Sequence, residues 1–203
     1  AFGTIAWGIV GAEGKKAFYC RGSPLSISSR LSDAAQGGEI LFPSQLLPFF
    51  TDQYIATKTR TGIFNLEISR TGIDQTPLPE KKSRTVQIPD AIAGQFYPLS
   101  LWKNRYPGEF RQVVPVFVAF EGLNSWKDLQ PFTTLALRLC SRYQGLFVEF
   151  DFSGHTPFFL LYFGFPQGRE DDIQLALNFL LDFQQALDTE LNQSDIRIKA
   201  GVS

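Results

Sequence analysis

The sequence contains no methionine, two cysteines and one histidine among its 203 residues. Cys20 and Cys140 lie too far apart to form a Cys-x-x-Cys metal site, and two cysteines are too few for a disulfide framework. We expect both to be free, buried thiols in a reducing compartment. The single histidine, His155, has no cysteine, second histidine or paired carboxylate near it in sequence. This isolation argues against a metal-binding or general-base role.

The sequence also lacks an excess of charge of either sign and any long apolar run. Lys plus Arg number 19 and Asp plus Glu number 20, so the net charge is -1 and a nucleic-acid partner is not expected. No apolar run approaches the roughly 20 residues of a membrane-spanning helix, and the first residues carry no basic stretch typical of a signal peptide. A composition of 44% hydrophobic and 19% charged residues is that of a globular protein, which we expect to be cytoplasmic.

Residues 1–50 are predicted to form a β-hairpin, a helix and a short strand. The helix is expected to begin with Ser23 at its N-cap and Pro24 at its first position. Gly37 and Gly38 are expected to end it with a left-handed cap. The hairpin is predicted over residues 5–10 and 17–20, and the strand over residues 39–42.

Residues 51–109 differ in character and are predicted to be a linker between domains, with some strand content. Extended segments at 54–57 and 63–68 alternate with Thr-Gly and proline turns. Repeated prolines and the charged run at 80–82 indicate an exposed connector.

Residues 110–203 are predicted to form an α+β domain with the ferredoxin-like element order β-α-β-β-α-β. The apolar run 113–120 predicts a strand buried on both faces, although Pro115 cannot donate to a ladder. Apolar residues recur at helical spacing over 129–140, and the acidic residues 170–172 are typical of a helix start. That second helix is expected to reach about residue 189, and the other strands are predicted over 146–152, 158–163 and 195–200.

Several sequence blocks resemble the class III nucleotidyl cyclase homology domain, and they are most similar to tandem cyclases of the soluble adenylyl cyclase type. The resemblance implies a ferredoxin-like sheet with helices on one face and a β-hairpin arm. In residues 110–203 the blocks are VPVFVAFEG (114–122), FGFP (163–166) followed by the acidic residues 170–172, and IRIKAGV (196–202). In residues 1–50 they are GIVG (8–11), FYCRG (18–22), LSISSRL (25–31) and GEIL (38–41).

The blocks occur in the reverse of the family's order, because residues 1–50 resemble the end of the domain and residues 110–203 its beginning. The resemblance therefore implies that the chain is the end of one cyclase domain followed by a linker and the start of a second, a circular permutant, or a rearranged or partial copy. We favour the first, since residues 51–109 have the composition of a natural linker. The absent methionine is typical of an excerpt from a longer protein.

The family cyclises a nucleoside triphosphate by attack of the ribose 3′-hydroxyl on the α-phosphate. Two metal ions, Mg²⁺ or Mn²⁺, assist this attack and are held by two aspartates. The resemblance places Ala119 and Gly154 at these aspartate positions, so a metal is expected only at an intact site elsewhere. It places Glu149 at the position of the purine-reading lysine. Nearby Asp151 is expected to face solvent together with Glu149.

The resemblance places the remaining site positions in the first helix. Ser23 stands at the purine-reading aspartate position and Ser26 at the ribose-binding asparagine position. Only Arg30 matches the family, where an arginine stabilises charge on the phosphate. Arg30 is equally well explained as a surface residue in an ion pair.

The function implied is that of a degenerate cyclase homology domain, which serves as a regulatory or dimerisation partner in a nucleotidyl cyclase. The implied partner is another cyclase homology domain, in a homodimer or within one chain, and the implied ligand is a nucleotide or a bicarbonate-like anion. The segment alone is not expected to cyclise ATP or GTP. The alternatives are a segment of an active adenylate or guanylate cyclase whose catalytic residues lie outside this chain, and a pure protein-interaction module.

Overall fold

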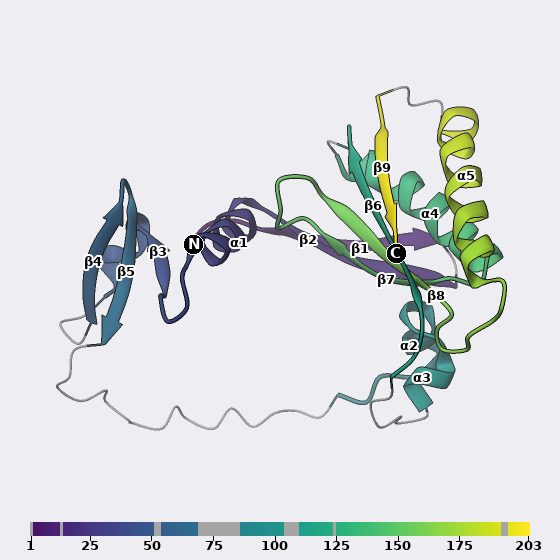
Figure 1. Ribbon diagram of the computed structural model, residues 1–203, viewed down its shortest axis with the longest axis horizontal. Helices are drawn as coiled ribbons and strands as arrows, with labels where there is room; N and C mark the ends of the chain where they lie inside the picture. Colours follow the sequence, from purple (N-terminus) through teal and green to yellow (C-terminus); the bar gives the residue numbers. More distant parts are fainter. Residues whose placement is uncertain are drawn as a thin grey trace. The chain divides into compact units, whose positions relative to one another are not determined.

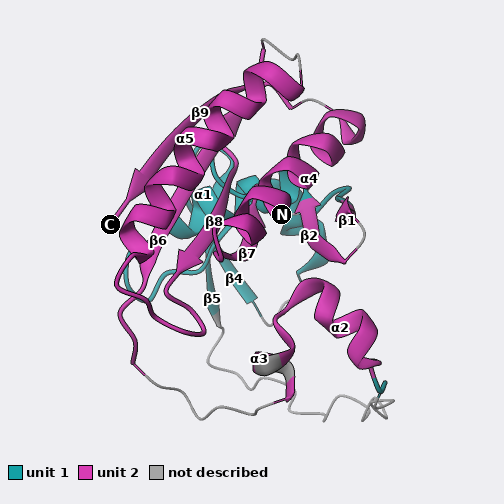
Figure 2. Ribbon diagram, turned by 90° about the vertical axis from the view of Figure 1, so that its right-hand side faces the viewer, with its two compact units in different colours: residues 1–6, 21–87, 153–155 teal, residues 7–20, 88–152, 156–203 magenta. Residues whose placement is uncertain are grey.

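The computed structural model describes residues 2–12, 14–50, 54–68, 86–103, 110–123, 125–191 and 195–203. The chain divides into two compact units (Figure 2), and each is described by itself. Unit 1 comprises residues 1–6, 21–87 and 153–155, and unit 2 comprises residues 7–20, 88–152 and 156–203. Helices and antiparallel sheets occur together, so the fold is a mixed α/β one.

Unit 1 contains one α-helix, one 3₁₀ helix and a three-stranded antiparallel sheet with the order β3-β5-β4. Buried Phe42 centres a small aromatic cluster, with its ring 4.5 Å from that of Phe50 and 5.9 Å from that of Phe64. The elements are α1 (Ser23–Ala34), β3 (Leu41–Pro43), η1 (Ser44–Phe49), β4 (Tyr54–Arg60) and β5 (Ile63–Ile68).

Both ends of α1 differ from the prediction. Its N-cap is Gly22, so Ser23 is the first helical residue, and no side chain caps the helix. Gly22 has φ of 156°, and a Cβ there would lie 2.7 Å from the carbonyl oxygen of Thr4, which explains the glycine. At the other end, the N–H of Ala35 donates to the carbonyl of Leu31 at 3.0 Å. The chain leaves the helix there in extended backbone, before the glycine pair that was expected to cap it.

Unit 2 contains a four-stranded antiparallel sheet with the order β7-β8-β6-β9, and α4 and α5 pack together on one of its faces (Figure 1). The strands are β6 (Val114–Glu121), β7 (Leu146–Asp151), β8 (Phe158–Phe163) and β9 (Arg197–Val202). The long helices are α4 (Trp126–Arg142) and α5 (Asp172–Glu190), and the short ones are α2 (Asp90–Phe96) and α3 (Leu99–Lys103). The predicted order of strands and helices after residue 110 is therefore observed.

The core of unit 2 lies between the sheet and the two long helices. Val116, Val118 and Phe120 of β6 are at most 1% exposed and point toward the helices. Pro115 is tolerated because β9 pairs with β6 only from Val116 onward, so the missing N–H breaks no bond to that strand. The other fully buried aromatic residues of this core are Phe132, Phe159, Phe163, Phe179 and Phe183.

Helix α4 begins with a capping box. The hydroxyl of Ser125 accepts from the backbone N–H of Asp128 at 3.3 Å, and the carboxylate of Asp128 accepts from the N–H of Ser125 at 3.0 Å. Two N–H groups that the helix itself cannot satisfy are thereby bonded. Asp171 is the N-cap of α5 and Asp172 its first residue, which confirms the predicted acidic helix start.

The hairpin of β1 (Ala6–Ala12) and β2 (Lys15–Arg21) packs on the core of unit 2 through Val10, Ala17 and Tyr19. The Gln130 side chain of α4 holds it by two hydrogen bonds to the Gly11 backbone, at 3.1 Å and 2.6 Å. A Cβ at Gly11 would lie 2.5 Å from the carbonyl oxygen of residue 15, so only glycine fits. The hairpin thus shares one hydrophobic core with α4, α5 and the four-stranded sheet, which lie about a hundred residues or more later in the sequence.

Helices α2 and α3 lie in the stretch that was predicted to be a linker with some strand content and no helix. Pro89 is the N-cap of α2, and Pro98 directly precedes α3. Proline is well suited to a helix start because its missing N–H would have no partner there. The repeated prolines of this stretch, which in the sequence indicate an exposed connector, therefore include two that precede helices. None of the helices in the described part of the chain is long and apolar enough to span a membrane.

Candidate functional site

The sheet of unit 2 has a second face, opposite the helices, which carries the sequence-predicted site position on β6. Alternate residues of a strand point to opposite faces, so Phe117, Ala119 and Glu121 lie on this open face while their neighbours enter the core. In the strand register, Ala119 stands opposite Lys199 of β9 and Glu121 stands opposite Arg197. The open face is therefore apolar in the middle of β6 and charged at its end.

The apolar part of the open face is centred on Phe117. Its side chain is 47% exposed, and its ring lies 5.5 Å from that of Phe158 on β8. Phe117 also stands opposite Leu160 of β8 and Gly201 of β9. An exposed aromatic residue on a flat sheet surface is typical of a position that packs against another protein surface.

The charged end of the open face surrounds a small cavity. The ammonium group of Lys199 lies 3.7 Å from the carboxylate of Glu121, and no ion pair involves Arg197 among the residues that the structure describes. Two cations therefore face one carboxylate at this cavity. The cavity has a volume of about 100 Å³ and is lined by Ala119, Phe120, Glu121, Thr156, Arg197 and Lys199.

The residues at the two predicted metal positions do not fit a metal site. Ala119 is half-buried and offers only a methyl group, next to the cations Arg197 and Lys199. Gly154 is exposed in the turn between β7 and β8 and has no side chain. Mg²⁺ and Mn²⁺ require several oxygen ligands, preferably carboxylates. Over the described ranges, no three or more His, Cys, Asp or Glu residues are grouped so as to hold a metal ion.

Two acidic residues of β7 face the same side of the sheet. Glu149, at the predicted purine-reading position, stands opposite Leu160 and is exposed. Asp151 stands opposite Phe158 and is half-buried, so it is less open to solvent than expected. His155, in the turn that follows, is exposed.

The remaining predicted site residues lie in unit 1. Ser23, Ser26 and Arg30 follow one another at helical spacing on α1 and share one of its faces. Arg30 is exposed, and its Nε donates weakly to the carbonyl of Ser26 at 3.4 Å. Ser23 is exposed and Ser26 is half-buried. The structure brings these three together, whereas Ala119 and Glu149 belong to unit 2.

The sequence analysis missed Thr156, Arg197 and Lys199. The signal was present in part, because the alternation of Arg197 and Lys199 in a predicted strand places both on one face. What the sequence could not provide was the register that sets this pair beside Ala119 and Glu121.

Both cysteines are free, as predicted. Cys140 is buried in α4, and burial raises the pKa of its thiol to about 12. Cys20 of β2 is only half-buried, so the prediction of two buried thiols holds for Cys140 alone. A thiol with such a high pKa is a poor nucleophile, and Cys140 therefore belongs to the core rather than to a reactive site.

Comparison with solved structures gives a partial likeness. No family model matches the sequence, and no curated protein matches it. Among solved structures, the guanylate cyclase domain of RhGC from Catenaria anguillulae, in complex with GTP, is similar with 22% identity and a TM-score of 0.38. The alignment covers 44% of this chain and 54% of that chain, so it spans about half of that chain's length. A likeness of this extent assigns no activity to the present chain.

Proposed function

We propose that the chain carries the elements of a degenerate class III nucleotidyl cyclase homology domain, which regulates a cyclase by pairing with another such domain. The proposal rests on the sequence blocks quoted above and on one observation at the open face. Ala119, at a metal position of the family, has no carboxylate and lies beside Arg197 and Lys199. This environment repels the metal ions that cyclisation needs.

The arrangement of unit 2 supports the assignment to this architecture. The element order β6-α4-β7-β8-α5-β9, with the strand order β7-β8-β6-β9, corresponds to the ferredoxin-like arrangement that the resemblance implies. The β1–β2 hairpin, joined to the same core, stands as the proposed arm of the domain. On this reading the segments at 7–20 and 110–203 contribute to one domain, in spite of their reversed order.

The open face is the proposed pairing surface. Exposed Phe117 and its neighbour Phe158 supply an apolar centre, and the charges of Glu121, Arg197 and Lys199 form a polar rim. Apolar centres with polar rims are the usual composition of protein–protein interfaces. A large aromatic residue at the centre is also the type that most often dominates binding.

The proposed ligand on the other unit is an anion at Arg30, either a nucleotide phosphate or a bicarbonate-like ion. Arg30 and Ser26 lie together on α1, and no acidic side chain is hydrogen-bonded to Arg30 within the described residues. An exposed guanidinium whose remaining N–H groups are not hydrogen-bonded can donate to an oxyanion. Because this site has a single exposed cation, we expect weak binding.

The proposal is tested by two measurements on the chain. With ATP or GTP and either Mg²⁺ or Mn²⁺, we expect no cyclic nucleotide to form. Formation of cyclic nucleotide that is lost in Arg30→Ala would contradict the proposal and favour an active cyclase. Titration with bicarbonate or a nucleotide should give binding that Arg30→Ala weakens, and no binding at all would favour a pure interaction module.

The pairing surface requires its own test. The chain is mixed with an isolated cyclase homology domain, and association is measured by sedimentation velocity. We expect Phe117→Glu to abolish association, because it places a charge at the apolar centre. The matched control is Phe18→Glu on the hairpin, where the native side chain is 53% exposed. Association that survives Phe117→Glu would place the pairing surface elsewhere.

A further inference from the structure

The outward face of α5 carries an apolar stripe that the core does not use. Ile173, Leu177 and Leu181 follow one another at intervals of four residues, and their side chains are 63%, 42% and 66% exposed. Residues at this spacing lie one above the other on a helix. The stripe, defined here as these three residues, is exposed along the helix.

An apolar stripe in this position is not explained by folding. A surface helix normally presents one apolar face to the core and a polar face to solvent. The inward face of α5 is already complete, and its buried residues are Ala176, Phe179, Phe183, Ala186 and Leu187. The stripe is therefore a second apolar face on the same helix, and such exposed faces mark contact surfaces.

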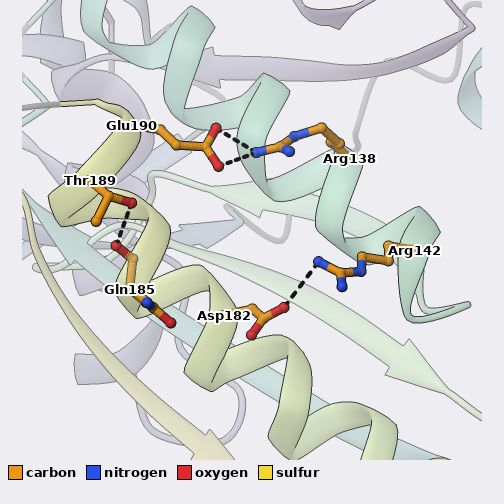
Figure 3. Close-up of polar contacts among 6 residues, drawn as sticks. All are labelled: Arg138, Arg142, Asp182, Gln185, Thr189 and Glu190. Carbon is orange, nitrogen blue, oxygen red and sulfur yellow. Dashed lines mark hydrogen bonds and ion pairs between the residues drawn. The ribbon is translucent and has the colours of Figure 1, made fainter.

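The charges on α5 define what can cover the stripe. The helix contains no lysine or arginine. Two of its acidic residues are neutralised by α4, since Asp182 lies 3.2 Å from Arg142 and Glu190 lies 2.6 Å from Arg138 (Figure 3). These two ion pairs lie on the side of α5 that faces α4, and they leave the stripe untouched.

Two further carboxylates stand at the ends of the stripe. Glu170 lies just before the helix, and Asp188 lies near its end, where helical spacing aligns it with Leu177 on the outward face. Neither has a hydrogen bond or an ion pair among the residues that the structure describes. The stripe is thus an apolar surface with an unpaired negative charge at each end.

A groove adjoins the stripe at its first residue. It has a volume of about 1110 Å³, and Ile173 forms part of its wall together with Val113, Pro115 and Val202. The charged residues that line it are of both signs, Arg111 and Arg169 beside Glu170 and Asp172. A side chain of a molecule on the stripe can therefore extend past Ile173 into an apolar depression.

We propose that this surface of α5 docks a basic amphipathic helix of a partner protein. The partner helix would place apolar residues at spacings of three and four along the stripe, which is the usual helix-in-groove pattern. Helix α5 has 19 residues. At 1.5 Å per residue this is about 28 Å, so a lysine or arginine is required near each end of about five helical turns.

A second copy of this chain does not fit the surface. Packing two α5 helices antiparallel would place the stripes together but would bring Glu170 of each copy next to Asp188 of the other. Packing them parallel would bring like residues together at both ends. Like charges in contact oppose association, whereas cationic ends on a partner helix are attracted.

The test uses the whole chain and a synthetic probe. The probe is a capped amphipathic helix of leucine, alanine and lysine, about five turns long, with lysines at both ends of its leucine face. Its matched control has glutamate at every lysine position. Binding is measured by fluorescence anisotropy at two salt concentrations, because the charged ends make affinity depend on salt.

We expect the lysine probe to bind and the glutamate probe not to bind. Leu177→Gln with Leu181→Gln should weaken binding at least about tenfold, since two apolar contacts are lost. Glu170→Gln with Asp188→Asn should weaken binding severalfold and reduce its salt dependence. The control variant is Ile40→Gln, at a side chain 58% exposed in unit 1, which should change nothing.

Three results would overturn the proposal. They are no binding of the lysine probe, binding that the Leu177 and Leu181 changes do not affect, and equal binding of the two probes. Dimerisation of the chain that is lost in Leu177→Gln would also overturn it, in favour of self-association. None of these results depends on whether unit 2 pairs with a cyclase domain, because Phe117 is unchanged throughout.

Discussion

Two phenylalanines on β6, only three positions apart, are predicted to contribute very differently to stability. Phe120 is 1% exposed, and its ring lies 5.0 Å from that of Phe132 and 5.8 Å from that of Phe152. Truncating a phenylalanine in such a core costs about 3–5 kcal/mol of unfolding free energy, because it removes apolar contacts and leaves a cavity. Phe120→Ala should therefore remove a large part of a domain stability that is typically about 5–15 kcal/mol.

Phe117 faces the other side of the sheet and should matter little for folding. Its side chain keeps 47% of its surface exposed and has one ring partner, Phe158. Burying a whole side chain contributes roughly 1.5–3 kcal/mol, and Phe117 is about half buried. Phe117→Ala should therefore lower the free energy of unfolding by about 1 kcal/mol. If Phe117 is a docking residue, Phe117→Ala should instead weaken association with the partner domain.

The two variants are compared by urea unfolding, followed by far-ultraviolet circular dichroism. The m-value should be unchanged in both, so that midpoints report stability alone. A one-residue change of register would exchange the two faces of β6. Equal costs for the two variants, or a larger cost for Phe117→Ala, would therefore refute the assignment of the open and buried faces.

Three further outcomes are expected. Because burial raises the pKa of Cys140 to about 12, iodoacetamide at about pH 8 should modify Cys20 first, and mass spectrometry of the peptides should show Cys140 modified only in urea. Ser125→Ala should cost about 1 kcal/mol by removing the cap of α4, whereas Ser125→Asn should restore most of it in the same unfolding assay. The hydrogen bond from Arg169 lowers the pKa of Asp171, so the stabilisation from this pair is present above the ordinary aspartate pKa and is lost as pH falls through the lowered value. In Arg169→Gln, carboxyl NMR should show the pKa of Asp171 rising toward its ordinary value, and an unchanged pKa would contradict this cause.

Elements whose bounds are set by burial were predictable from the sequence. The strand expected over 158–163 is β8, Phe158–Phe163, and the helix expected over 129–140 lies within α4, Trp126–Arg142. In α4 apolar residues recur at the helical period because one face must leave water, whereas β8 is a continuous apolar run. Pro89 and Pro98 show where this reasoning fails, since a proline marks a turn and a helix start with equal strength.

The sequence predicted which residues occupy the candidate site positions, but not which side chains surround them. That Ala119 and Gly154 lack carboxylates is visible in the sequence, and the consequence for metal binding follows from their chemistry alone. The cations beside Ala119 were not predictable, because Lys199 reaches it through strand pairing across 80 residues of sequence. Register between distant strands depends on the packing of the whole sheet, which local patterns do not determine.

The two proposed surfaces of unit 2 lie on opposite sides of its sheet and differ in charge. The open face carries charges of both signs, Arg197 and Lys199 beside Glu121, Glu149 and Asp151, while α5 on the helical face has acidic residues only. A basic helix on the stripe would contact the helical face and would leave Phe117 free for a cyclase partner. Substitutions at Phe117 and at Leu177 should accordingly affect two different partners, and their effects should be independent, since residues without shared contacts act additively.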